Sequence, residues 1–259
     1  MISLAFASAS PQNAKIFHLA GKLRSTIFRI FAGLLPTSTA MFVLRSFLLL
    51  YLYAYCLSAC GPLGEERLPI LGERLIQEKE IDGKTVIDTL YHRIPPFEFV
   101  NQDSQKVSQT TFEGKIYVSD FFFTTCPTIC PKMKSQLLRI YEKYLDDERV
   151  LILSHSVDIV HDSVPVLKDY AERLGIKSSK WHLVTGSEEA IYDMAGHYLL
   201  AAQKDEEALG GYDHSGQFML IDTNRHIRAT CDGTNPEDVN RFMKDIDRLL
   251  AEQFPKTKP

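Results

Sequence analysis

The stretch IYVSDFFFTTCPTICP, residues 116–131, decides the fold. Its first eight residues are almost all aromatic or β-branched, which is typical of a strand buried on both faces of a sheet. Cys126 and Cys130 follow, and apolar residues then recur at helical spacing from Met133 to Tyr144, with Lys and Glu on the opposite face, toward solvent. We therefore predict a buried strand that leads through a cysteine-bearing turn into an amphipathic helix.

Strands and helices alternate after this helix. The patterns predict strands at 150–157 and 182–185, helices at 163–174 and 188–197, and two further strands at 217–222 and 226–231 joined by a turn. Asn235 followed by Pro236 is typical of a helix start, so we expect a closing helix through residues 239–250. This order predicts an α/β, thioredoxin-like fold with a central mixed sheet flanked by helices.

The segment before the buried strand predicts an N-terminal addition to that fold. Residues 86–93, 97–100 and 106–107 resemble short strands in a hairpin arrangement, with a turn at 101–104. Residues 61–81 are charged and lack a sustained apolar period, which indicates a tether with a short helix. We predict these parts: an export signal at 1–59, a tether and N-terminal extension at 60–93, the thioredoxin-like domain at 94–252 and a tail at 253–259.

The first 59 residues are typical of a targeting signal. They contain five basic residues and no Asp or Glu, and the apolar run at 46–59 is shorter than the roughly 20 residues of a transmembrane helix. Leu57-Ser58-Ala59-Cys60 resembles a bacterial lipobox, which predicts lipidation of Cys60 and a membrane-anchored lipoprotein facing the periplasm. Met41 would be a sufficient start for such a signal peptide. A mitochondrial transit peptide and an uncleaved anchor are the alternatives, and all three place the body outside the cytosol.

Charge and cysteine usage restrict the partners. The net charge is -4, but without the five basic residues of the leader the remainder has 24 basic and 33 acidic residues, a balance of -9. Such a body repels phosphate backbones, so nucleic acid is excluded as an expected partner. Cys126 and Cys130 form the only close pair after the leader. In an oxidising compartment this pair predicts a disulfide, a redox couple or a metal site.

The chemistry of that pair favours a soft metal. Cysteines four apart at a helix start are expected on one face, where the helix dipole favours the thiolate form. Pro127 and Pro131 suit a helix start and stiffen the loop. Two thiolates suit Cu(I), and one added imidazole could also hold Cu(II). A structural zinc site normally has four protein ligands, and a plain structural disulfide is the other alternative.

A family resemblance extends this interpretation. The buried strand, Cys-Pro-Thr-Ile-Cys-Pro, Ser156-Val157-Asp158, Tyr170-Ala171-Glu172-Arg173 and Asp213-His214-Ser215 resemble the Sco/SenC family in the same order. The resemblance covers roughly residues 94–250. It implies copper, as Cu(I) or Cu(II), bound by Cys126, Cys130 and His214, and a metallochaperone that serves the copper A-bearing subunit of cytochrome c oxidase. The family's prolines are missing from the loop at 158–164, which leaves partner contacts there in doubt.

Thiol-disulfide oxidoreductase is the alternative function, because a reactive cysteine pair at a helix start also suits disulfide exchange. Cys126 and Cys130 would then be the redox-active pair. Thioredoxins carry a proline where this chain has His214, so the histidine favours metal. A peroxidase is disfavoured because no Arg lies beside Cys126. Among the remaining candidates we expect His155 in the core, His161 near the site but not a ligand, Cys231 as a buried or unpaired thiol, and Asp120 as a residue without a catalytic role.

Overall fold

The computed structural model describes residues 45–46, 48, 67–81, 84–205, 207 and 211–255, without the side chains of Gln203, Asp213 and His214. The predicted lipobox with Cys60, and most of the export signal, lie outside these residues. Within the described part of the chain, no helix is long and apolar enough to cross a membrane.

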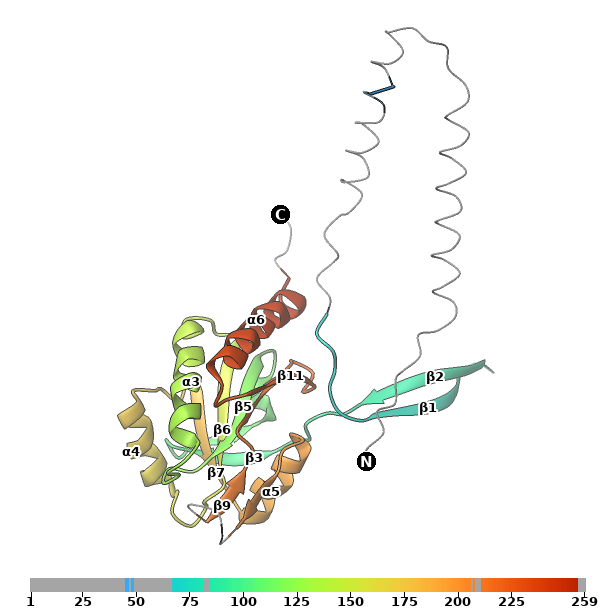
Figure 1. Cartoon of the computed structure of the whole chain (residues 1–259). Helices are drawn as coiled ribbons and strands as arrows, with labels where there is room; N and C mark the ends of the chain where they lie inside the picture. The colour runs from blue at the N-terminus through green and yellow to red at the C-terminus, as the bar shows by residue number, and fades with distance from the viewer. Residues whose placement is uncertain are drawn as a thin grey trace, which may run out of the picture. The chain divides into compact units, whose positions relative to one another are not determined.

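A seven-stranded mixed sheet forms the centre of the molecule (Figure 1). Its strands, in sheet order, are β11 (Ile227–Asp232), β10 (Gln217–Ile221), β5 (Ile116–Phe122), β6 (Val150–Ser156), β7 (Trp181–Thr185), β3 (Glu98–Asn101) and β4 (Lys106–Ser108). The β5–β6 and β6–β7 pairs are parallel and the others are antiparallel. Every residue of β5 is buried, as its sequence predicts. The predicted thioredoxin-like fold is confirmed, with the later predicted strand and helix ends shifted by at most a residue in most cases.

Alternate side chains of β5 contact the two helical layers. Helices α3 (Cys130–Lys143), α4 (Val164–Leu174) and α6 (Pro236–Gln253) cover one face of the sheet, and α5 (Glu188–His197) covers the other (Figure 1). Phe122 of β5 stacks on Tyr170 of α4, with ring centroids 5.6 Å apart. Tyr117, on the opposite face of β5, hydrogen-bonds Tyr198 at the end of α5 with 3.0 Å between the hydroxyl oxygens. The cysteine-bearing helix therefore lies on the α3–α4–α6 face.

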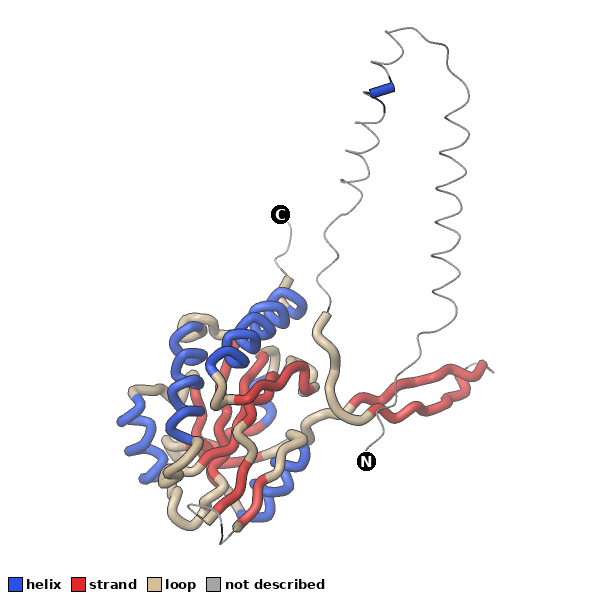
Figure 2. The backbone as a smooth tube through the Cα atoms, viewed as in Figure 1, coloured by secondary structure: helices blue, strands red, loops and turns tan. Residues whose placement is uncertain are grey.

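The N-terminal addition consists of two hairpins. β3 and β4 confirm the predicted strands on either side of the turn at 101–104. β1 (Arg74–Ile81) and β2 (Lys84–Tyr91) form a separate two-stranded sheet (Figure 2). The expectation of a short helix before residue 81 is therefore wrong. Ile81 pairs with Lys84, and the Asp-Gly sequence between them is a strong hairpin signal that the tether interpretation overlooked.

Short elements complete the fold. The 3-10 helix η1 (Gln109–Phe112) precedes β5, and β8 (Ala202–Lys204) pairs with β9 (Tyr212–His214) in a second small sheet. None of the three was predicted, because segments of three or four residues carry little periodicity. The predicted cap of the last helix is confirmed, since the side chain of Asn235 accepts hydrogen bonds from the amides of Glu237 and Asp238.

Candidate metal centre

The two cysteines lie on different kinds of backbone. Cys130 is the first residue of α3, after the N-cap Ile129, with Pro131 in the first turn as predicted. Cys126 lies in the preceding turn, where its amide donates to the carbonyl of Phe123 at 3.4 Å. The expectation that both cysteines project from the helix is wrong, because Pro127 disfavours helical conformation at the residue before it. The turn nevertheless folds back so that the two thiols meet.

The two thiols are buried and hydrogen-bonded to one another. Cys126 is 7% exposed and Cys130 is 1% exposed, and neither is in a disulfide. Burial opposes ionisation of Cys126, but hydrogen bonds from the Cys130 thiol and from the backbone of Thr128 and Cys130 outweigh it and lower the pKa of Cys126. Burial, together with that same thiol contact, raises the pKa of Cys130 strongly. Cys126 is therefore the thiol that ionises first, and Cys130 stabilises the charge.

Lys134 adds a cation beside the pair. Its ammonium lies 4.1 Å from the ring centroid of Tyr170, and it shares a small cavity lining with Cys130 and Asp120. Burial lowers the pKa of Lys134, while the neighbouring cysteines oppose that change. Sequence reasoning placed the lysines of this helix on the solvent face. The signal that could have found Lys134 is its spacing of four from Cys130, which places both on one helix face.

Asp162 holds the chain that leads into the cysteine turn. Its buried carboxylate accepts from the amide of Thr124 at 3.0 Å, from the Thr124 hydroxyl at 2.5 Å and from the Ser156 hydroxyl at 2.5 Å. Burial raises the pKa of Asp162, and these three hydrogen bonds oppose the rise. The loop without the family's prolines therefore still supplies the carboxylate that joins the ends of β5 and β6. Sequence reasoning missed Asp162, because the partner Thr124 is 38 residues away.

Asp120 lies beneath the cysteine turn within β5. The Ser154 hydroxyl donates to its carboxylate and in turn accepts from the indole N–H of Trp181 at 2.8 Å. Burial raises the pKa of Asp120 to about 7, although the Ser154 hydrogen bond opposes the rise. This buried carboxyl also contributes to the raised pKa of Cys130. The structure therefore gives Asp120 an electrostatic influence on the Cys130 thiol.

The segment that carries His214 runs beside the cysteine turn. The His214 backbone pairs with Ala202, and the residues two positions before and after it lie near the turn. The Tyr212 ring packs on Phe123 with centroids 5.3 Å apart. A Cβ atom on Gly216 would lie 3.6 Å from Cδ1 of Ile129, the residue before Cys130. The fold therefore places the residues on either side of His214 near Phe123 and Ile129, which flank the cysteine turn, while the His214 side chain lies outside the described part of the structure.

The other histidines of the described residues have structural partners. His155 is fully buried and stacks on Phe121 at 4.7 Å, and burial lowers its pKa to about 3, which confirms the core prediction. His161 is largely exposed, and its Nδ1 lies 2.8 Å from the Asp158 carboxylate. Burial lowers the pKa of His182 to about 4, and this ring contacts the Asn101 amide at 3.3 Å.

Cys231 is confirmed as a buried thiol outside any disulfide, and burial raises its pKa strongly. No group of three His, Cys, Asp or Glu side chains within the described residues is arranged to hold a metal, and the side chain of His214 is not among those residues. The described part of the candidate centre is therefore a dithiol, with Lys134 beside it and Asp120 below.

A buried dithiol at a helix start on a thioredoxin-like sheet defines a class of proteins that bind soft metals or exchange disulfides. The SCO1/SenC family model matches residues 88–251. The chain belongs to the SCO1/SenC family. This finding confirms the resemblance that the cysteine motif and the Asp-His-Ser segment indicate.

Solved structures of the family agree with this assignment. A SCO1/SenC family lipoprotein from Bacillus anthracis is 29% identical, with a TM-score of 0.56 over 61% of this chain and 94% of that one. BsSco, described as a member of the Sco family of cytochrome c oxidase assembly proteins with a disulfide switch, is 27% identical with a TM-score of 0.55 over 64% of this chain and 95% of that one. Arabidopsis thaliana ScoI, solved with copper bound, is 25% identical with a TM-score of 0.52 over 61% and 98%.

Proposed function

We propose that this chain is a copper-binding assembly factor that holds copper through Cys126, Cys130 and His214. The observation that carries the proposal is the hydrogen-bonded pair of buried thiols, and Tyr212, two residues before His214, packs on Phe123 at the start of the cysteine turn. Related proteins support it, because one is a cytochrome c oxidase assembly protein and another was solved with copper bound. The copper is cargo, and its acceptor is the copper A-bearing subunit of a respiratory oxidase.

The donor set fits that cargo. Thiolate sulfur is a soft ligand and prefers Cu(I), and an imidazole would extend the site to Cu(II). The thiol with the lowered pKa, Cys126, is the more accessible of the two and would ionise first. Cys130 must lose a proton that its buried surroundings retain, so copper binding should release protons. Lys134 lies where its charge favours the ionised pair.

The place of action we propose is the periplasmic face of a bacterial membrane. Leu57-Ser58-Ala59-Cys60 has the composition of a lipobox, and a lipidated Cys60 would tether the domain. A family member of known structure is a lipoprotein, which supports the proposal. A membrane-anchored donor would meet a membrane-bound oxidase subunit without diffusing away from it.

The test is a Cu(I) competition titration of the reduced, purified chain against a chromophoric chelator. We expect Cys126→Ser and Cys130→Ser each to weaken Cu(I) binding by more than about 100-fold, because loss of even an outer-shell partner typically costs 10–100-fold. Cys231→Ser is the matched control, since it removes a buried thiol outside the site and should leave the affinity unchanged. Equal affinities for Cys126→Ser and Cys231→Ser would reject the proposed ligands.

Thiol-disulfide oxidoreductase is the second candidate. The unequal burial of the two thiols favours it, because the less buried Cys126 could attack a partner disulfide and the more deeply buried Cys130 could then release the mixed disulfide. In the first step the Cys126 thiolate attacks the partner disulfide, forms a mixed disulfide and releases one partner thiolate. In the second step the Cys130 thiolate attacks Cys126, which forms the Cys126–Cys130 disulfide and releases the second partner thiolate. Turnover of a disulfide substrate by the reduced chain, lost in both serine variants, is the expected result.

A further inference from the structure

A second cavity lies at the other end of β5 from the cysteines. It has a volume of about 260 Å³. Its lining comes from the segment between β2 and β3, from η1 and the residue after it, from the start of β5, and from the turn between β10 and β11. The residues that line it are Arg93, Phe97, Gln109, Thr110, Phe112, Glu113, Tyr117, Asp222, Thr223 and Arg225. Neither proposed function uses any of them.

Arg225 reaches this cavity from a strained backbone. Its φ is 68°, in the left-handed region that non-glycine residues rarely occupy. The conformation is fixed on both sides, because the Arg225 amide donates to the carbonyl of Asp222 at 2.9 Å and its carbonyl accepts from the amide of Ile94 at 2.9 Å. A costly backbone conformation that the surroundings enforce is often found at ligand sites.

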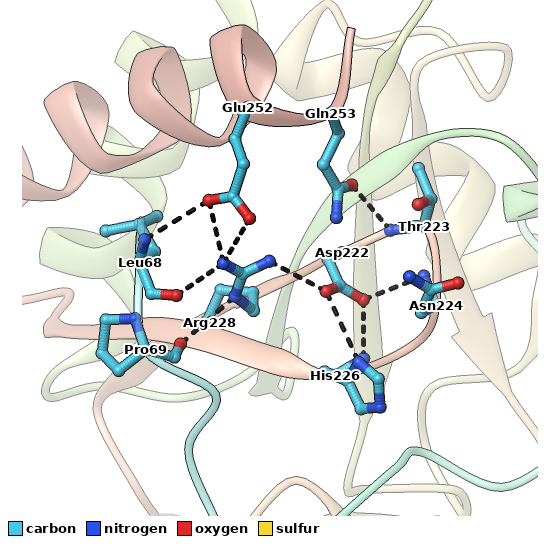
Figure 3. A network of polar contacts seen from close by, with 9 residues as sticks. All are labelled: Leu68, Pro69, Asp222, Thr223, Asn224, His226, Arg228, Glu252 and Gln253. Atoms are coloured by element: carbon cyan, nitrogen blue, oxygen red, sulfur yellow. Dashed lines mark hydrogen bonds and ion pairs between the residues drawn. The ribbon is translucent and has the colours of Figure 1, made fainter. Parts of the chain in front are cut away.

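One buried donor atom of the Arg225 guanidinium also has no hydrogen-bond acceptor among the described residues. Its Nη1 atom is buried and makes no hydrogen bond within the described structure. The nearest acidic residue of the turn, Asp222, is committed elsewhere: its carboxylate pairs with Arg228 at 3.0 Å and accepts from the amides of Asn224 and His226 (Figure 3). A buried guanidinium donor without an acceptor is costly, and an anion in the cavity would satisfy it.

Arg93, which is exposed, adds a second cation to the lining. Burial and the charge of Arg93 both lower the pKa of Arg225, so the two cations repel one another. No ion pair within 4 Å involves either arginine among the described residues. Glu113 is the only other acidic residue of the lining, and it is exposed.

The rest of the lining is aromatic. Phe97, Phe112 and Tyr117 are all buried, and their rings contact in sequence, with centroids 6.0 Å apart for Phe97–Phe112 and 4.4 Å for Phe112–Tyr117. An aromatic wall suits a hydrocarbon or ring, whereas a planar guanidinium suits a carboxylate through two parallel hydrogen bonds. From this combination we propose that the cavity is a binding site for a small organic carboxylate with an apolar body, held by Arg225 and Arg93.

The test is calorimetric titration of the purified full chain at low ionic strength with benzoate as the probe. Benzyl alcohol, which has the ring without the charge, and inorganic phosphate, which has the charge without the ring, are the matched ligands. We expect benzoate to bind at least about tenfold more tightly than either, as hydrogen bonds to charged groups predict. Phosphate binding as tightly as benzoate would overturn the assignment to an organic carboxylate.

Arg225→Gly separates a ligand site from a structural role. It should weaken benzoate binding by at least about tenfold while raising the midpoint of thermal unfolding, because glycine relieves the positive φ. Arg93→Gln should weaken binding similarly, and Glu113→Gln should strengthen it by removing a competing carboxylate. Arg173→Gln, an exposed arginine on α4, is the control and should bind like the unchanged chain. The site is rejected if benzoate does not bind, or if Arg225→Gly and Arg173→Gln bind it equally.

Discussion

The cysteine turn and strand β9 approach the same place from very different supports. The turn begins from a strand that is buried throughout, and a buried carboxylate with three hydrogen bonds fixes its start. β9 belongs to a separate two-stranded sheet, and its Tyr212 ring packs on Phe123 at the start of the turn. The Tyr212 hydroxyl adds one hydrogen bond to Asp158 at 2.9 Å. The two thiols are therefore preorganised by the core, whereas the histidine is carried by an element with few anchors.

Because of this difference, the two halves of the proposed centre, the cysteine turn and β9, should respond differently to mutation. Changes beneath or beside the cysteine turn should alter both stability and copper binding, because the same buried groups serve the core and the site. Changes in β9 should alter mainly the contribution of His214 to Cu(II) binding. If both halves responded alike, the comparison would fail.

The largest effect is expected from Asp120, beneath the turn. Its pKa is about 7 in the folded chain against an ordinary 3.8, so its contribution to stability is present at low pH and lost as pH rises through 7. Asp120→Asn should therefore gain stability relative to the unchanged chain by up to about 4 kcal/mol between pH 4 and pH 8. The measurement is urea unfolding across this range, followed by the fluorescence of Trp181.

The unchanged chain and Asp120→Asn must be compared at each pH, because His155 changes the stability with pH in the opposite direction. Its pKa is lowered to about 3, so the stability it contributes is present above pH 6.5 and lost as pH falls. This contribution is the same in both chains and cancels in the difference. Stability profiles that stay parallel from pH 4 to pH 8 would show that Asp120 is not protonated in the fold.

A smaller effect is expected from Asp162, beside the turn. Asp162→Asn places an amide donor where the carboxylate accepts from Thr124 and Ser156, so we expect a loss of about 2 kcal/mol in the free energy of unfolding. Cu(I) affinity should fall about tenfold, since the start of the turn is no longer held. Asp169→Asn is the control, because Asp169 forms only an exposed pair with Arg173 and should change little. An unchanged copper affinity in Asp162→Asn would show that the turn holds its shape without this anchor.

The smallest effect is expected from β9. Tyr212→Phe keeps the ring on Phe123 and removes only the hydrogen bond to Asp158, so the free energy of unfolding should fall by about 1 kcal/mol. Cu(I) binding by the thiols should be nearly unchanged, and Cu(II) binding should weaken by less than about tenfold. A loss of Cu(I) affinity as large as that in Asp162→Asn would contradict the separation of the two halves.

The sequence predicted the parts of the molecule that depend on local pattern. The continuous apolar run at 116–123, the helical spacing from Met133 onward and the Asn235 cap each depend on neighbours a few residues apart, and all are confirmed. The cysteine pair was also recognisable, because both the chemistry and the family motif are contained in residues 126–131. Family membership followed from that motif together with the later Asp-His-Ser segment.

The remainder depends on contacts that no local pattern encodes. Asp162 can hydrogen-bond Thr124 only after β5 and β6 have paired. Lys134 lies beside the thiols because its ammonium packs on the ring of Tyr170, which belongs to another helix. Arg225 has a positive φ because the turn is clamped by Asp222 and Ile94, a position for which glycine would be the expected residue. Burial, charge and strain at these residues arise from tertiary structure, and only Lys134 has a local signal, its spacing of four from Cys130.

The most direct test of the central claim is a Cu(II) titration of the unchanged chain, Cys126→Ser, Cys130→Ser and His214→Ala, with disulfide reductase activity measured on the same samples. Binding of copper by two thiolates and one imidazole predicts that His214→Ala weakens Cu(II) binding by at least about tenfold. The contradictory result is a His214→Ala chain that holds Cu(II) as tightly as the unchanged chain while both cysteine variants lose reductase activity. The protein would then be a thiol-disulfide oxidoreductase.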